Sequence, residues 1–155
     1  MLFRSTNDYI AINHGDLAMF ATLFFGVFDP TTGNLTYINS GHEALLLCDR
    51  TGTVKKELPA TAPALGIVPN LTYQVGQVQL AAGDFLVGYT DGVTEARATD
   101  GSFFGKDRLL KQLQSPFASV QDLLNQIAQQ VDAYTGGAEQ FDDMTMIAVR
   151  RKEGE

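Results

Sequence analysis

Short apolar runs separated by turns fill the first part of the chain, which is the pattern of β-strands. Residues 20–28 are apolar almost throughout, as expected of a strand that is covered on both faces. The polar turn at residues 29–34 leads back into residues 35–39. Residues 44–48 and 53–58 flank a Gly-containing turn in the same way, so the pattern predicts two hairpins.

The middle of the chain departs from this pattern of apolar runs and turns. The prolines within residues 59–70 predict a loop that lies over a sheet without joining it. Apolar residues alternate with one parity over residues 71–75, whereas Val78 and Leu80 hold the opposite parity. That change of phase predicts a β-bulge near Gly76.

Helical spacing appears late. Residues 106–114 and 120–134 carry apolar side chains at intervals of three and four, and Ser119 is the predicted N-cap of the second helix. Residues 1–12 are ambiguous but compatible with a helix. Strands followed by amphipathic helices indicate an α+β layer arrangement.

Two acidic turns adjoin apolar runs and are the candidate chemistry. The apolar run of residues 85–89 stops before Asp91, while the run of residues 144–149 starts just after Asp142 and Asp143. If these runs are antiparallel neighbours, the end of one lies beside the start of the other, so Asp91 and Asp142 converge. Carboxylate oxygens without nearby His or Cys suit Mg²⁺ or Mn²⁺.

A plainer interpretation competes with the metal site. Asp-Gly is a common turn dipeptide, and Asp100-Gly101 repeats it with no chemistry attached. Two adjacent carboxylates also occur in solvated loops, although their repulsion favours a compensating positive charge. From the residues alone, a cation site and solvated turns both stay open.

Composition and charge narrow the function classes. A chain of 155 residues with 45% apolar content can bury a core, and we expect a single domain over residues 1–155. Net charge −7, with 11 scattered Lys and Arg, argues against nucleic acid as a partner.

The longest apolar stretch, residues 19–28, is too short to span a membrane, so we predict a cytoplasmic domain without membrane contact. We expect Cys48 to be a buried hydrophobe.

Five motifs, taken in order, resemble the C-terminal two-thirds of a SpoIIE/RsbU-type phosphatase domain, a bacterial branch of the PPM (protein phosphatase 2C-like) family. The motifs are Ala-Thr-Leu-Phe-Phe-Gly-Val-Phe-Asp at residues 21–29, Tyr-Ile-Asn-Ser-Gly-His at 37–42, Tyr-Thr-Asp-Gly-Val-Thr-Glu at 89–95, Phe-Gly at 104–105 and Asp-Asp-Met-Thr at 142–145. Each motif is weak evidence alone, but the five motifs in this order are a specific resemblance.

The resemblance implies a fold and a site. The fold is an αββα sandwich of two antiparallel sheets with outer helices, incomplete at the N-terminus. Asp91 and Asp142 match the two C-terminal metal-ligand aspartates, and Asp143 becomes an adjacent or alternative ligand. Gly92 matches the glycine that turns the backbone at the metal cleft, and Glu95 the acidic position after it. His42 belongs to a family signature, but we place it in the structure and not in the chemistry.

The resemblance also implies an activity. A water activated by Mn²⁺ or Mg²⁺ would hydrolyse phosphoserine or phosphothreonine on a bacterial regulatory protein. In this branch the usual substrate is a phosphorylated anti-sigma-factor antagonist, and an N-terminal sensor or receiver domain usually controls the activity. The chain would therefore be part of a longer signalling protein.

One family motif is missing. The first metal motif, Gly-Asp followed by Gly-His-Gly, supplies the aspartate that bridges both metals, and Gly15-Asp16 lacks the Gly-His-Gly that should follow. Either the chain is a fragment, which we favour, or it is a degenerate member. Two alternative functions follow: a pseudophosphatase that binds a regulatory partner without turnover, or an acidic α+β domain that holds a structural cation.

Overall fold

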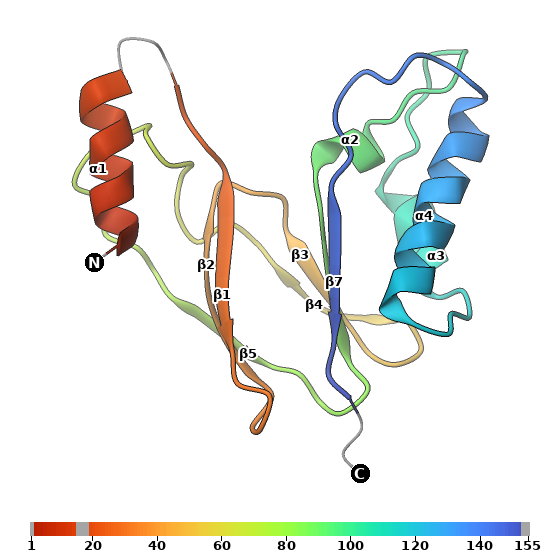
Figure 1. Cartoon of the computed structure of the whole chain (residues 1–155), viewed down its shortest axis with the longest axis horizontal. Helices are drawn as coiled ribbons and strands as arrows, with labels where there is room; N and C mark the ends of the chain where they lie inside the picture. Colours follow the sequence, from red (N-terminus) through yellow and green to blue (C-terminus); the bar gives the residue numbers. More distant parts are fainter. Residues whose placement is uncertain (1, 15–18, 153–155) are drawn as a thin grey trace. The chain divides into compact units, whose positions relative to one another are not determined.

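The computed structural model describes residues 2–14 and 19–152 (Figure 1). Contacts divide the chain into two compact units. The first comprises Met1–Ala44 and Leu58–Gln79, and the second comprises Leu45–Glu57 and Leu80–Glu155. In the part of the chain that is described, no helix is long and apolar enough to cross a membrane.

The first unit contains one helix and a three-stranded antiparallel sheet. Helix α1 spans Leu2–His14, so the ambiguous N-terminal segment is helical and ends two residues later than its pattern suggested. Strands β1 (Leu23–Phe28) and β2 (Asn34–Ser40) form the first predicted hairpin, with Phe28 opposite Leu35. Strand β5 (Gly76–Gln79) pairs with the other edge of β2, giving the order β1-β2-β5.

The loop of residues 59–70 is tied to α1 by a buried amide. Asn7 is fully buried; its side chain accepts a hydrogen bond from the Gly66 N–H at 3.0 Å and donates one to the Val68 carbonyl at 2.9 Å. The same loop makes isolated β-bridges at Ala62 and Leu65. As predicted, the loop supplies no strand to the sheet, and its bridges are isolated ones. The three prolines in the segment limit its pairing to single bridges.

Two expectations for this unit are wrong. Strand β1 was expected to be covered on both faces, yet Phe25 is 47% and Val27 is 61% exposed. Alternate residues of a strand point to opposite faces, and the face that carries Phe25 and Val27 is the exposed one. No bulge occurs near Gly76, because β5 begins there and residues 71–75 lie outside the strand. A Cβ at Gly76 would meet the Tyr37 ring at 2.4 Å, so only glycine fits beneath that ring.

The second unit contains a four-stranded sheet of order β4-β3-β6-β7, in which β6 pairs antiparallel with both β3 and β7. Its strands are β3 (Leu45–Cys48), β4 (Val54–Leu58), β6 (Phe85–Tyr89) and β7 (Met146–Arg150). Its helices are α2 (Asp91–Thr94), α3 (Lys106–Leu113) and α4 (Val120–Thr135). The second hairpin and both late helices are thus confirmed. Together the two units have the expected α+β class, with two antiparallel sheets plus helices.

Helices α3 and α4 lie on one side of this sheet (Figure 1) and close its core. Phe85 and Val87 of β6 pack in one cluster with the fully buried Leu123 and Ile127 of α4. The predicted N-cap is confirmed, because the Ser119 hydroxyl accepts a hydrogen bond from the Asp122 N–H at 3.1 Å. Strand β6 is buried along its whole length.

Cys48 also belongs to this core, as its pattern predicted. The side chain is fully buried, and burial, together with the nearby Asp49 and Asp84 carboxylates, raises the pKa of its thiol to about 12. The buried Asp84 carboxylate is itself paired with Lys55 at 2.6 Å. The Cys48 thiol consequently stays protonated near neutral pH and is a packing group.

Leu123→Ala or Ile127→Ala is expected to lower the free energy of unfolding by about 2 to 4 kcal/mol, because each side chain is completely enclosed and its removal leaves a cavity. Urea unfolding followed by circular dichroism measures the change. Gln129→Ala, on the exposed face of the same helix, is the matched control. A loss below about 0.5 kcal/mol in either core variant would contradict the packing.

Candidate metal centre

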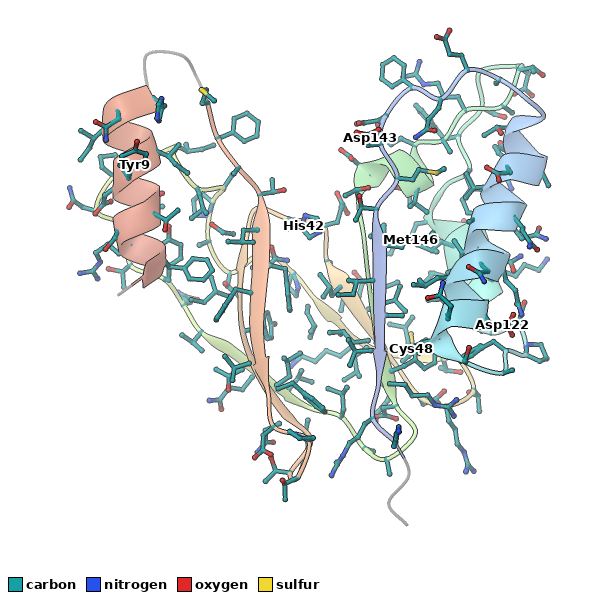
Figure 2. All side chains as sticks on the ribbon, in the orientation of Figure 1. Tyr9, His42, Cys48, Asp122, Asp143 and Met146 are labelled. Carbon is teal, nitrogen blue, oxygen red and sulfur yellow. The ribbon has the colours of Figure 1, made fainter. Side chains whose placement is uncertain are left out.

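The two acidic turns are brought together by the pairing of β6 with β7. Tyr89 lies opposite Met146 in the antiparallel register, so the end of β6 adjoins the start of β7. This confirms the predicted adjacency of the two apolar runs. The turn that begins at Asp91 therefore lies beside the loop that carries Asp142 and Asp143 (Figure 2).

Thr90 fastens the two turns together. Its N–H donates to the Thr145 carbonyl at 3.0 Å, and its hydroxyl accepts from the Thr145 N–H at 3.0 Å. The same hydroxyl donates to the Asp143 carbonyl at 3.0 Å. Sequence reasoning missed this residue. Its position directly before an acidic turn suggests an N-cap of α2, but no side-chain capping bond forms there and the hydroxyl reaches across to β7.

Gly92 makes the close approach possible. A Cβ built there would lie 2.5 Å from the Asp143 carbonyl oxygen and 3.3 Å from that of Asp142. Backbone atoms cannot swing aside as the end of a flexible side chain can, so any side chain at this position would push the acidic loop away. The requirement for glycine arises from this proximity.

The acidic turn that begins at Asp91 is a single turn of helix, α2. Asp91 is its first residue, and the Asp91 carboxylate accepts a hydrogen bond from the Gly92 N–H at 3.0 Å. The Glu95 N–H closes the turn on the Asp91 carbonyl at 2.7 Å. The carboxylate is thus oriented by its own backbone while remaining exposed.

The opposite loop orients its carboxylates in a similar way. The Asp143 N–H donates to the Asp142 carboxylate at 2.7 Å, and the Gln140 side-chain amide donates to the Asp142 carbonyl at 2.8 Å. Both aspartates are exposed, and Figure 2 places Asp143 at the start of β7, beside α2. A hollow of about 270 Å³ adjoins Asp142 and is also lined by Glu95 and Arg97.

The donor chemistry fits a hard divalent cation. The Asp91, Asp142 and Asp143 carboxylates, together with neighbouring backbone carbonyls, offer oxygen atoms, which Mg²⁺ and Mn²⁺ prefer. Within residues 2–14 and 19–152, no group of three or more Asp, Glu, His or Cys side chains is clustered as a metal site. A cation held here would therefore take much of its coordination from water. The Gly15-Asp16 pair lies outside the described residues.

His42 lies in the first unit, and its surroundings agree with a structural role. Its backbone N–H donates to the Asn39 side chain at 2.9 Å, and its Nδ1 lies 3.3 Å from the Thr22 hydroxyl. Asn39 is fully buried and its amide also donates to the Leu58 carbonyl at 3.2 Å. The signature around His42 therefore fixes the backbone that follows β2.

Comparison with known families decides the assignment. The family model of stage II sporulation protein E (SpoIIE) matches residues 1–152. The chain belongs to the SpoIIE family. The curated protein IcfG of Synechocystis sp. is 49% identical over 148 residues, which are 96% of this chain and 23% of that protein. The phosphoserine phosphatase RsbU of Bacillus subtilis is 29% identical over 138 residues, 88% of this chain and 41% of that protein.

Solved structures agree on the fold of this SpoIIE-family chain. The SiaA-PP2C domain of Pseudomonas aeruginosa superposes with a TM-score of 0.75 at 22% identity, covering 93% of this chain and 57% of that one. The Mn-presoaked SpoIIE phosphatase domain of Bacillus subtilis gives a TM-score of 0.69 at 20% identity, covering 99% and 66%. The chain thus spans less than half of the curated relatives and about three-fifths of these structures.

Proposed function

We propose that this chain contributes to a metal-dependent PPM-type phosphatase that hydrolyses phosphoserine or phosphothreonine on a bacterial regulatory protein. One observation carries the proposal: β6 and β7 bring Asp91 beside Asp142 and Asp143, with Gly92 against their backbone, in a member of the SpoIIE family. The relatives named phosphoserine phosphatases support the reaction class.

The chain's residues would act by holding and orienting. Asp91 and Asp142 would hold Mn²⁺ or Mg²⁺ from opposite sides of the β6–β7 junction, and Asp143 would be an adjacent or alternative ligand. Gly92 would let the two loops approach, and its own carbonyl is a further oxygen donor. When bound, such a cation lowers the pKa of its water and neutralises charge on phosphoryl oxygens.

The partner we propose is a phosphorylated anti-sigma-factor antagonist or a similar phosphoprotein. Support comes from RsbU, which is named a phosphoserine phosphatase, and from a SpoIIE structure that includes a fragment of a regulatory domain. We further propose that a sensor or receiver domain lies upstream in a longer protein. Residues 1–155 would act as one domain of that protein, in the cytoplasm.

Asp91→Asn and Asp142→Asn are each expected to weaken Mn²⁺ binding by about tenfold or more, because each removes a formal charge from an oxygen-donor site. Calorimetry on residues 1–155 measures the affinity. Asp49→Asn is the matched control, since Asp49 has the same charge and lies in the turn between β3 and β4, where its carboxylate is engaged by Thr51 at 2.6 Å. Unchanged affinity in both site variants would exclude the proposed centre.

The reaction itself is tested by Mn²⁺-dependent release of phosphate from a phosphoserine protein. If a form that carries all the family motifs bound both the metal and the phosphoprotein but released no phosphate, the pseudophosphatase would be favoured. If it bound the metal but neither bound nor hydrolysed the phosphoprotein, a structural cation would be favoured.

A further inference from the structure

Arg97 lies between two aromatic rings beside the acidic loop. Its guanidinium carbon is 4.2 Å from the centre of the Phe141 ring and 5.1 Å from that of Phe103. Both distances fall within the range of cation–π attraction. Phe141 directly precedes Asp142, so Arg97 contacts the loop one residue before a proposed ligand.

The backbone of Arg97 is held in a short hairpin formed by residues 96–104. Arg97 and Phe103 form an antiparallel bridge, and the Phe104 N–H donates to the Ala96 carbonyl at 2.8 Å. A further bond joins the Ala98 N–H to the Ser102 carbonyl at 2.9 Å. The hairpin fixes the point from which the Arg97 side chain extends.

Helix α4 anchors this hairpin. The Tyr134 hydroxyl lies 2.7 Å from the Ser102 hydroxyl and donates to the Phe103 carbonyl at 2.9 Å. Arg108 of α3 donates to the Phe104 carbonyl at 2.8 Å and stacks 4.4 Å from the Tyr134 ring. Arg97 is thus connected to two packed helices through hydrogen bonds and ring contacts.

Phe141, by contrast, is 70% exposed, so burial contributes little to its position. The loop that carries it follows α4 and ends at β7, where Thr90 fastens it. Between these ends, the stacking of Phe141 on Arg97 ties the loop to the helical side of the unit. A tie at this point would limit the motion of Asp142.

We propose that Arg97 is a positioning residue, which stacks on Phe141 and thereby holds the Asp142 loop in the arrangement that binds the cation; the inference rests on the proposed metal centre. The charge of Arg97 opposes a nearby cation by Coulomb repulsion. Its benefit must therefore come from ordering the loop. Ordering of the loop by Arg97 strengthens Mn²⁺ binding, whereas the charge of Arg97 weakens it.

Amide hydrogen exchange on the whole chain without metal tests the tie directly. Arg97→Gln and Phe141→Leu are each expected to speed exchange of the Asp143 amide and its loop neighbours by about two- to fivefold, the size of an exposed cation–π contact. Phe141→Tyr keeps the ring and is expected to behave like the wild type. Arg50→Gln, which removes an equal charge from an exposed turn, is the control. Exchange that is unchanged in both Arg97→Gln and Phe141→Leu would overturn the proposal.

Mn²⁺ affinity provides the second measurement. Phe141→Leu changes no charge and is expected to weaken binding by about two- to fivefold, whereas Arg97→Gln is expected to weaken it less, because it also removes a repulsive charge. The double variant is expected to be no weaker than Phe141→Leu. Unchanged or tighter binding in Phe141→Leu would overturn the positioning role. If the wild type bound no Mn²⁺, the proposed function would fail, while the exchange measurement would still decide whether Arg97 orders the loop.

Discussion

A longer form of this protein that carries the family's Gly-Asp and Gly-His-Gly motif upstream is expected to hydrolyse phosphoserine at least about a thousandfold faster than residues 1–155 alone. By the family resemblance, that motif supplies the carboxylate that anchors a second cation. In the described residues, Asp91, Asp142 and Asp143 do not form a group of three side chains that could hold a metal ion by themselves. Loss of charge neutralisation in the transition state typically costs several kcal/mol, which sets the size of the effect.

The comparison uses excess Mn²⁺, a phosphoserine protein and a generic aryl phosphate. The longer form with Asp142→Asn is the control, because it keeps the upstream motif and loses a proposed ligand of the second unit. Equal rates from the long and short forms would show that the upstream motif is unnecessary. A long form that stays inactive while binding Mn²⁺ would make the pseudophosphatase the better description.

Gly92→Ala is expected to be the most damaging single-methyl change at the junction of β6 and β7. The added Cβ would lie 2.5 Å from the Asp143 carbonyl oxygen, so the helix turn or the acidic loop must move. Overpacking of this kind costs about 1 to 3 kcal/mol. A displacement of the ligands near 1 Å is also expected to reduce turnover by about a hundredfold in the active form.

Mn²⁺ calorimetry and urea unfolding separate these effects. Gly83→Ala is the control: its φ of +86° strains the backbone for any side chain, and it precedes β6, at the other end of that strand from the acidic turns. We expect Gly83→Ala to lose stability without losing metal affinity, whereas Gly92→Ala loses both. If Gly92→Ala bound Mn²⁺ as tightly as the wild type, the contact of α2 with the acidic loop would be unimportant for the site.

The β6–β7 junction was predictable because both of its strands are strongly apolar and the acidic turns mark their ends. The side chains that fasten it were not. Thr90 acts through bonds to residues 143 and 145, and Arg97 through the ring of Phe141, so both roles depend on contacts distant in sequence. A periodic pattern carries no information about such contacts.

The errors in the first unit have a related cause. An apolar run predicts a strand, but it does not say whether both faces of the strand are covered, and the face of β1 that carries Phe25 and Val27 is exposed. The change of parity near Gly76 is real in the sequence. It marks where β5 begins, and the preceding residues are not in a strand, so the parity rule does not apply to them.

The bond between Thr90 and Thr145 joins residues 55 positions apart, and α3 and α4 occupy the interval. Contacts of such long sequence separation form late, because a large loop must close before they stabilise anything. At a synthesis rate of about 5 to 20 residues per second, a nascent chain would spend several seconds with β6 complete and β7 still unmade. During that time Asp91 would be exposed without its counterpart. At the proposed metal centre, cation binding would therefore begin only after translation has passed Arg150.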